Sequence, residues 1–425
     1  MNVWNYRLRF SPIMALLSLA IISGCSSTII TKNSPQEPIV NQSSDPLPEV
    51  ELGQNLNQLL SQISQTQQIP LSLLETSFND TKSPSSVRKL VLPPSGTFRK
   101  NWLDYRARFI EPIRLRAGKT FLQENQEFLT QIEQKSGVPA QVIVAIIGIE
   151  TIYGRQLGNF RVKDVLTTLA FDYPETPNQK KRAALFRDQL QELIFMCWNQ
   201  AGGVLPSQST AQGIDVSLFN NCLNQTSSYA GAIGLPQFMP GSIRKYAVDG
   251  DGDGKIDLRQ NPEDAIASVA HFLQNHGWQT GRPIYFKVPA DAIGSAQLLA
   301  DGEPALKYSI RELIEKGVLL PAQGDPMQGG VEPQSKALIV DLPYLNKARD
   351  TRVRYLVGLN NFLTIVQYNR SYFYAQSVAE FAEALGYKNT SIDFVPATTN
   401  AEKGLEIKKL KIKPKSKPKK LRPTT

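Results

Sequence analysis

One apolar segment, Val142–Gly154 (VIVAIIGIETIYG), constrains the fold of this 425-residue chain more than any other stretch. Its first eight residues are apolar apart from Gly148, and a segment of helical length that is apolar on every side predicts a buried helix. Pro139 precedes it at a position that a first helical turn tolerates, and Gly154 follows where a glycine commonly ends a helix. The segment therefore predicts a helix inside a hydrophobic core.

A single carboxylate, Glu150, stands near the end of this helix. Burial and the negative end of the helix dipole both disfavour its charge, so its pKa should be raised. A Glu with a raised pKa is suited to act as a general acid at a glycosidic bond. The alternative is that Glu150 marks the point at which the helix reaches solvent.

The N-terminus has the pattern of an export signal. Arg7 and Arg9 precede the apolar run Ile13–Ile22, which is too short for a comfortable membrane span, and residues 1–24 are predicted to be a signal peptide. The segment ISGC, ending at Cys25, resembles a bacterial lipobox, in which the cysteine becomes the lipidated first residue. We expect a periplasmic lipoprotein held in the outer membrane by acyl chains, because no acidic residue follows Cys25. An ordinary signal peptide with a chance cysteine is the alternative.

The net charge of +9 is confined to the C-terminal tail. Residues 407–422 hold nine of the 47 Lys and Arg residues and no acid, and the other 38 basic residues balance 38 acidic ones. Lys and Pro alternate there without aromatic residues for stacking on bases, which argues against a nucleic-acid partner. The tail, residues 396–425, is predicted to be disordered and attracted to anionic envelope polymers or lipid head groups.

Two cysteines remain once Cys25 is assigned to the lipobox. In an exported, oxidising setting, Cys197 and Cys222 favour a disulfide, and two buried free thiols are the alternative. The only histidines, His271 and His276, give little support to a His-rich zinc site or a Ser–His pair.

Composition and periodicity predict a mainly helical chain with a small β-containing part. Helical spacing covers residues 102–135 and 264–277, and Leu and Ile also recur at helical spacing within 51–76. Residues 197–227 have the polar composition of a long loop, and strand-like runs occur in 280–345. The predicted organisation is a signal peptide (1–24), a lipidated Cys with a flexible tether (25–85), a catalytic core (86–279), a small β-containing subdomain (280–345), a return to the core (346–395) and the basic tail (396–425).

The segment SYAGAIGLPQFMPGS, residues 228–242, is dense in small residues, which allow backbone to approach a ligand closely. The Gln237 amide can donate and accept hydrogen bonds beside Phe238 and Met239, as a glycan site requires. A tight helix–turn junction is the alternative reading of the same residues.

Residues 249–257, DGDGDGKID, match the first half of an EF-hand calcium loop, with Asp at alternate positions and Gly at the sixth. The closing position holds Gln260 in place of Glu, and Asp264 is an acid that could close a longer loop. The candidate Ca²⁺ ligands are Asp249, Asp251, Asp253, Lys255 and Asp264. An Asp–Gly-rich turn without metal is the alternative.

Taken together in this order, these motifs resemble the membrane-bound lytic murein transglycosylase B family. The resemblance covers roughly residues 90–390 and rests on IIGIETIYGR (146–155), SYAGAIGLPQFMP (228–240), the DGDGDG loop (249–254), DAIASVAHFLQNHGW (264–278) and LNNFLTIVQYN (359–369). It implies a lysozyme-like helical core with one catalytic Glu, a Ca²⁺ site in an EF-hand-like loop, and a small β-containing subdomain. No organic cofactor is implied.

Position by position, the resemblance places the catalytic acid on Glu150. It implies that further residues contact the peptidoglycan substrate, namely Tyr105, Arg182, Ser228, Gln237, Phe238, Met239, Tyr368, Asn369 and Tyr374. Arg182 would meet a peptide or lactyl carboxylate, although the segment ETPNQ (175–179) is inserted just before it. Phe272 stands where an aromatic residue with a hydroxyl is expected.

The expected reaction cleaves the β-1,4 bond between N-acetylmuramic acid and N-acetylglucosamine. No second acid accompanies Glu150 in its motif, and a two-carboxylate glycosidase needs one nearby. One carboxylate suffices if the substrate supplies the nucleophile, giving 1,6-anhydromuramic acid. The alternatives are a muramidase, in which water attacks, and a non-catalytic peptidoglycan-binding lipoprotein.

Overall fold

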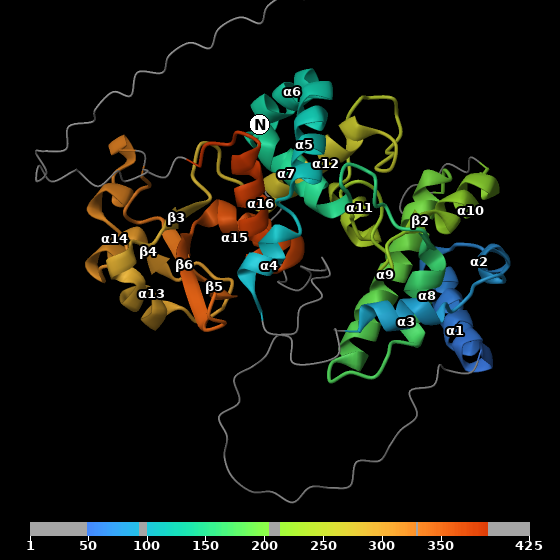
Figure 1. The fold of residues 1–425 in the computed structure, drawn as a ribbon. Helices are drawn as coiled ribbons and strands as arrows, with labels where there is room; N and C mark the ends of the chain where they lie inside the picture. Colours follow the sequence, from blue (N-terminus) through green and yellow to red (C-terminus); the bar gives the residue numbers. More distant parts are fainter. Residues whose placement is uncertain (1–48, 93–99, 204–212, 329, 390–425) are drawn as a thin grey trace, which may run out of the picture. The chain divides into compact units, whose positions relative to one another are not determined.

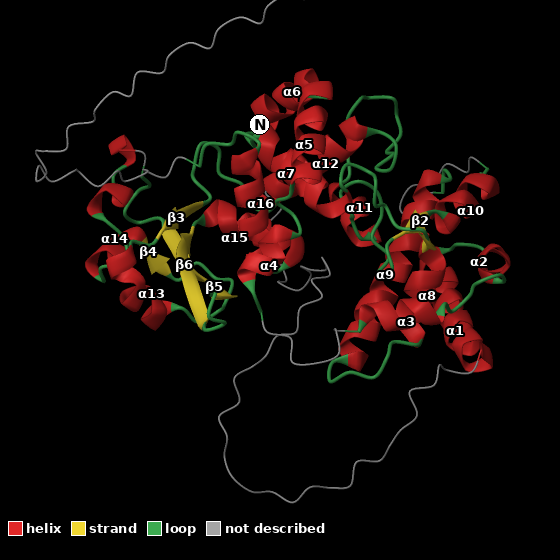
Figure 2. Ribbon diagram, viewed as in Figure 1, coloured by secondary structure: helices red, strands yellow, loops and turns green. Residues whose placement is uncertain are grey.

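The computed structural model describes residues 49–92, 100–203, 213–328 and 330–389. Most of these residues are helical, and a small sheet is formed by strands between residues 285 and 358 (Figures 1 and 2). The predicted signal peptide, Cys25 and the basic tail lie outside the described residues. Among the residues described, no helix combines the length and apolarity needed to cross a membrane.

Three helices precede the core, and they are part of the folded body. They are α1 (Glu49–Gln67), α2 (Leu71–Phe78) and α3 (Ser85–Val91), and both α1 and α3 pack on α8 (Val162–Phe171). Leu60 and Leu74 are fully buried. The predicted tether over 25–85 is therefore wrong from residue 49 onward, because apolar side chains on these helices gain about 25 cal/mol per Å² of surface that they bury.

A charged network fixes the N-terminal helices to α8. The Lys163 ammonium is almost fully buried, donates to the Ser77 carbonyl at 2.6 Å and pairs with Asp80 at 2.6 Å. Arg161 joins Asp80 to Asp164, whose carboxylate it meets at 2.7 Å. The Lys163 hydrogen bond is the largest of the favourable interactions that lower the pKa of Asp80 to about 2.

Ten helices of the described residues make up the core, and they include α7, the apolar helix predicted from the sequence. They are α4 (Trp102–Ala107), α5 (Pro112–Glu124), α6 (Gln126–Ser136), α7 (Ala140–Thr151), α9 (Gln179–Gln200), α10 (Val216–Asn224), α11 (Pro240–Tyr246), α12 (Pro262–Asn275), α15 (Asn360–Asn369) and α16 (Tyr372–Ala384). α5, α6, α12 and α16 all contact α7. Ten of its twelve residues are buried, which explains why the segment is apolar on every side.

Residues 197–227 are more regular than the predicted loop. α9 continues to Gln200, α10 spans Val216–Asn224, and β2 (Thr226–Ser227) pairs antiparallel with β1 (Phe160–Arg161). A disulfide between Cys197 and Cys222 joins α9 to α10. The polar composition gave no clear helical signal for α10, because few of its residues, Phe219 among them, are buried.

The sheet has the strand order β3–β6–β5–β4, all antiparallel: β3 is Tyr285–Lys287, β4 is Tyr308–Ser309, β5 is Lys336–Leu345 and β6 is Thr351–Gly358. Alternate residues of β5 point to opposite faces, so Leu338 and Val340 enter the main core while Ile339 enters a second, smaller core. Two helices, α13 (Ile293–Leu299) and α14 (Ile310–Glu315), belong to this part, as do the 3₁₀ turns η1 (Ala290–Ala292), η2 (Pro321–Gly324) and η3 (Pro326–Gln328).

The predicted boundary at residue 345 is wrong because it cuts a hairpin. β6 pairs with β5 along its own whole length, from Gly358 opposite Leu338 to Thr351 opposite Leu345. β6 is then tied to the core helices by Glu380 of α16, which accepts hydrogen bonds from Arg354 of β6 at 2.9 Å and from Arg106 of α4.

Candidate active site

Glu150 lies in the last turn of α7 and keeps part of its surface open to solvent. Desolvation by the surrounding protein raises the pKa of its carboxyl group to about 7, and a hydrogen bond from Tyr374 opposes that rise. The Tyr374 hydroxyl donates to Glu150 Oε1 over 2.6 Å, although the two residues are 224 positions apart in sequence. Glu150 can therefore carry a proton near neutral pH and still reach a ligand.

The backbone turns sharply just after Glu150. Ile152 and Tyr153 both have positive φ values, 50° and 56°, and a β-branched residue in this region is a clear outlier. Ile152 ends the helix with its N–H bonded to the carbonyl of Gly148. The predicted cap at Gly154 is thus two residues too late. A side chain at position 148 would lie 2.3 Å from the Tyr153 hydroxyl, so the turn requires Gly148.

Arg114 of α5 supports the same helix end and was not predicted from the sequence. Its side chain is buried, and its Nε donates to the Gly148 carbonyl over 2.8 Å. A cation near the C-terminus of a helix interacts favourably with the helix dipole. In the sequence Arg114 is an ordinary charged residue of a helical segment, so no local signal identifies it.

The loop 228–240 is held beside Glu150 by two hydrogen bonds. Thr151, the residue after Glu150, donates from its hydroxyl to the Leu235 carbonyl at 3.1 Å. Tyr368, at the end of α15, donates to the Pro236 carbonyl at 2.6 Å. Gln237 adopts a positive φ of 50° and donates to the Gly234 carbonyl. The glycine-rich motif and the acid are therefore adjacent.

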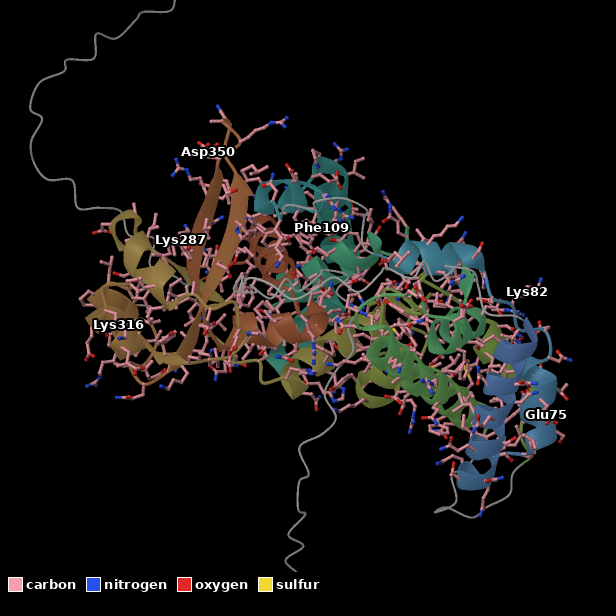
Figure 3. All side chains as sticks on the ribbon, turned by 90° about the horizontal axis from the view of Figure 1, so that it is seen from below. Glu75, Lys82, Phe109, Lys287, Lys316 and Asp350 are labelled. Carbon is pink, nitrogen blue, oxygen red and sulfur yellow. A yellow bond between two sulfur atoms is a disulfide. The ribbon has the colours of Figure 1, made fainter. Side chains whose placement is uncertain are left out.

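Three tyrosines from different helices are placed near Glu150. The rings of Tyr368 and Tyr374 stack with their centroids 6.0 Å apart and their planes 11° apart. Tyr105 of α4 packs against Phe373 and against Phe109, which Figure 3 labels. Burial first, and then the negative charge of Glu150, raise the pKa of all three phenols. They remain neutral hydroxyls, able to donate hydrogen bonds.

The other predicted substrate residues fall into two groups. Ser228 accepts backbone hydrogen bonds from Ala230 and Ala232, so its hydroxyl shapes the loop. Phe238 and Met239 are each only 3% exposed and form the inner wall of the loop. In contrast, the side-chain oxygen of Asn369 is buried and accepts no hydrogen bond from the described residues.

In the structure, Arg182 contacts residues other than Glu150 and the tyrosines around it. It lies in the first turns of α9, where it interacts with Tyr173, the ring that stacks on Phe186. Among the described residues, no contact joins Arg182 to Glu150 or to the tyrosines around it. The structure thus gives no support for its predicted position in the cleft.

Phe272 occupies the expected position of a hydroxylated aromatic residue. Its ring packs between His276, at a centroid distance of 4.0 Å, and Tyr368, at 4.8 Å. Phe272 is 3% exposed. It therefore supports Tyr368 by packing and contributes no hydrogen bond.

An acidic cluster forms where the loop after α11 meets the first turn of α12. Asp249, Asp251 and Asp264 each bring a carboxylate oxygen to within 4.8 Å of the others, and Asp253 and Lys255 line the same hollow. An all-oxygen set of this kind suits a hard cation such as Ca²⁺. The buried Asp264, and not Gln260 at the twelfth position, closes the cluster.

Backbone hydrogen bonds pre-form this loop. Both oxygens of Asp264 accept N–H groups, from Gly250 at 2.7 Å and from Asp257 at 2.6 Å. The N–H of Gly254 donates to Asp249 and is the largest cause of the lowered pKa of that carboxyl group. The carboxylates are thus oriented by the protein itself.

The chain is similar to several proteins of known activity. The Transglycosylase SLT domain family matches residues 52–383. The membrane-bound lytic murein transglycosylase B of Escherichia coli is 36% identical over 332 residues, covering 78% of each chain. The crystal structure of soluble lytic transglycosylase SltB1 from Pseudomonas aeruginosa is 32% identical, covers 78% of this chain and 98% of that one, and has a TM-score of 0.63.

A third similar structure contains calcium, the ion predicted for the acidic loop. The Escherichia coli lytic transglycosylase Slt35 in complex with calcium is 30% identical, covers 78% of this chain and 92% of its own, and has a TM-score of 0.61.

Proposed function

This chain belongs to the transglycosylase SLT domain family and is a lytic transglycosylase that acts on peptidoglycan, and we propose on this premise that Glu150 is its catalytic acid and then its base. The 2.6 Å hydrogen bond between Tyr374 and Glu150, at the end of a buried helix, is the observation that carries the proposal.

In the first half of the reaction Glu150 acts as the general acid. A pKa of about 7 keeps a proton available at neutral pH. Glu150 donates it to the glycosidic oxygen as the bond to C1 of N-acetylmuramic acid breaks. The acetamido carbonyl of the substrate stabilises the positive charge that develops at C1.

In the second half Glu150 acts as the base. It accepts the proton of the muramoyl C6 hydroxyl, whose oxygen attacks C1, so that the product is 1,6-anhydromuramic acid and no water is consumed. Tyr374 donates to the carboxylate form that this half requires. Asp164, the next acid in the sequence, is paired with Arg161 and bonded to the Lys82 backbone, which supports a mechanism with one carboxylate.

The walls of the proposed cleft come from several elements. Tyr105 and the loop carrying Ser228 and Gln237 flank Glu150, and Phe238 and Met239 support that loop from within. Tyr368 and Asn369 close the cleft from α15. Arg182 stays a weaker candidate for the substrate carboxylate.

A digest of purified sacculi tests this function. The soluble muropeptides should end in 1,6-anhydromuramic acid. Reducing ends in their place would assign the muramidase alternative, in which the same Glu150 acid is followed by attack of water.

Replacing Tyr374 by Phe should change both the rate and its pH dependence. The Tyr374 hydrogen bond lowers the pKa of Glu150, so its loss should raise that pKa and move the alkaline fall of kcat/KM to higher pH. A charge-assisted hydrogen bond is worth about 1.5–3 kcal/mol, so kcat should fall on the order of tenfold or more.

Tyr308→Phe is the matched control, because that hydroxyl bonds to the Leu299 carbonyl in the β-containing part. The pH profile of each variant on soluble glycan fragments provides the measurement. An unchanged profile for Tyr374→Phe would show that its hydroxyl does not act on Glu150.

We propose that the acidic loop binds Ca²⁺ as a structural ion. The oxygen donors converge and are already oriented, so the residues fit the ion; Asp249, Asp251, Asp253, Asp264 and the Lys255 carbonyl would hold it. When bound, Ca²⁺ neutralises the mutual repulsion of these carboxylates and takes no part in proton transfer.

Calcium should therefore raise the thermal stability of the protein. At a hundredfold excess over Kd, binding to the folded state contributes about 2.7 kcal/mol. Asp251→Ala should abolish that gain in melting temperature, while Asp291→Ala, an exposed acid in η1, should keep it. An equal response of wild type and Asp251→Ala in calorimetric titration would show that the loop holds no ion.

We further propose that Cys25 is lipidated and anchors the protein to the outer membrane, facing the periplasm. The relative from Escherichia coli is a membrane-bound protein by its name, which supports an anchored location. The basic tail would add an electrostatic attraction to anionic polymers of the envelope.

A further inference from the structure

A second hollow lies between the start of α9 and α1, and α1 is within the segment that was expected to be a tether. We call it the N-terminal groove. Its volume is ≈ 450 Å³, and the residues that characterise it are Gln58, Gln62, Phe171, Gln179, Lys180 and Arg187. None of them is among the residues around Glu150.

Each wall of the N-terminal groove is formed by one face of a helix. Gln58 and Gln62 are one turn apart on α1, and Lys180 and Arg187 are two turns apart on α9, so each pair lies on one face of its helix. α1 itself packs on α8 through buried residues such as Leu59 and Leu60, which fixes its position beside α9. The groove is therefore built by the fold and not by a single loop.

The floor of the groove is aromatic and ordered. Phe171, at the end of α8, lies under the guanidinium of Arg187 at 5.9 Å from the ring centroid. Gln179 uses its amide nitrogen to bind the Tyr173 carbonyl at 2.8 Å, which directs its oxygen as the remaining acceptor. Gln179 also ends the inserted segment 175–179, so the insertion builds one edge of this groove.

The side chains that line the groove indicate which class of ligand it can bind. Side-chain amides can both donate to and accept from hydroxyl and N-acetyl groups. Lys180 and Arg187 add two positive charges, and the described residues of the lining include no Asp or Glu. The ligand that matches is a hydroxyl-rich, N-acetylated polymer that also carries carboxylates.

We propose that the N-terminal groove is a second, non-catalytic binding site for peptidoglycan, which holds a stretch of the polymer while another stretch occupies the cleft at Glu150. This inference rests on the proposed function, because peptidoglycan is the polymer that the enzyme meets. Its consequence is specific: the groove contributes to binding of the intact polymer and leaves the cleavage of short fragments unchanged.

The test uses the full chain carrying Lys180→Ala with Arg187→Ala. In a Glu150→Gln background, the amount retained on purified sacculi measures binding without cleavage. Loss of charge-assisted hydrogen bonds should weaken retention on the order of tenfold. In the active protein, the rate on sacculi at low protein concentration should fall by a similar factor, while kcat/KM on fragments of a few disaccharides should not change.

Two further variants separate the groove from general charge. Lys119→Ala with Lys316→Ala removes the same charge from exposed lysines on α5 and after α14, and it should bind sacculi as the wild type does. Figure 3 labels Lys316. Gln58→Ala with Gln62→Ala keeps the charge and should weaken binding severalfold. Melting temperatures verify that all the variants are folded.

Several results would overturn the proposal. Unchanged retention of Lys180→Ala with Arg187→Ala on sacculi would show that the groove does not bind the polymer. An equal loss of retention in the control pair would show only a general electrostatic attraction. Tight binding of poly-glutamate in place of sacculi would make it a site for any polyanion. A parallel loss on short fragments would place these residues in the catalytic cleft. Failure of the proposed mechanism would appear separately, as cleavage that survives Glu150→Gln.

Discussion

Glu150→Gln should abolish nearly all cleavage of peptidoglycan while the protein stays folded and still binds sacculi. The amide has nearly the same shape as the carboxyl group but can neither give up a proton to the glycosidic oxygen nor accept one from the C6 hydroxyl. Because a single group performs both steps, the loss should reach at least the 10²–10⁴-fold typical of general acid–base catalysis.

The measurement is the release of soluble muropeptides from sacculi by equal amounts of each protein. Glu75→Gln, a change of an exposed residue on α2, is the matched control and should be fully active (Figure 3). Any residual activity of Glu150→Gln should lack the alkaline fall near pH 7, since the group that titrates is gone. Turnover near the wild-type rate would contradict the assignment of Glu150.

Loss of the disulfide should cause the largest change in stability. Cys197 and Cys222 are 25 residues apart, and closing a loop of this length restricts the unfolded chain by about 3 kcal/mol. Cys197→Ser with Cys222→Ser should therefore lower the free energy of unfolding by about that amount. Both side chains are buried, so the serine hydroxyls add a further cost.

Urea denaturation of the wild type and the double variant provides the comparison, each with and without a reducing agent. Reduction should destabilise the wild type and leave the double variant unchanged. If the two proteins unfold at the same urea concentration under oxidising conditions, the bridge contributes nothing to the free energy of unfolding.

The sequence was sufficient to predict the centre of this molecule. The all-round apolar pattern of Val142–Gly154 predicted α7, because a helix covered on every side by other helices can have no polar face. The same segment marked Glu150 as the one carboxylate at its end. The Asp–Gly pattern likewise identified the acidic loop, since its ligands are close in sequence.

The contacts that complete the site could not be predicted from local patterns. Tyr374 bonds to Glu150 across 224 residues and Thr151 to Leu235 across 84, and such contacts depend on how whole helices pack. Only the family resemblance indicated Tyr374 beforehand. Arg114 had no signal of either kind, because one charged residue of an amphipathic helix looks like any other.

The errors have the same origin. α1 has a weak apolar stripe, and only its packing on α8 distinguishes a docked helix from a tether. The early end of α7 at Ile152 depends on two left-handed residues that local propensity disfavours, and which the surrounding packing enforces. Both departures lie next to a site: the first forms the N-terminal groove and the second follows the acid.

The most direct test of the central claim is the origin of the new end that each cleavage creates. Sacculi digested in isotopically labelled water by the wild-type protein should give muropeptides that end in 1,6-anhydromuramic acid, one water lighter than a reducing end and free of label from the solvent. This result is expected if the C6 hydroxyl attacks C1 while Glu150 takes its proton. Muropeptides with a labelled reducing end would show that water is the nucleophile and would contradict the account.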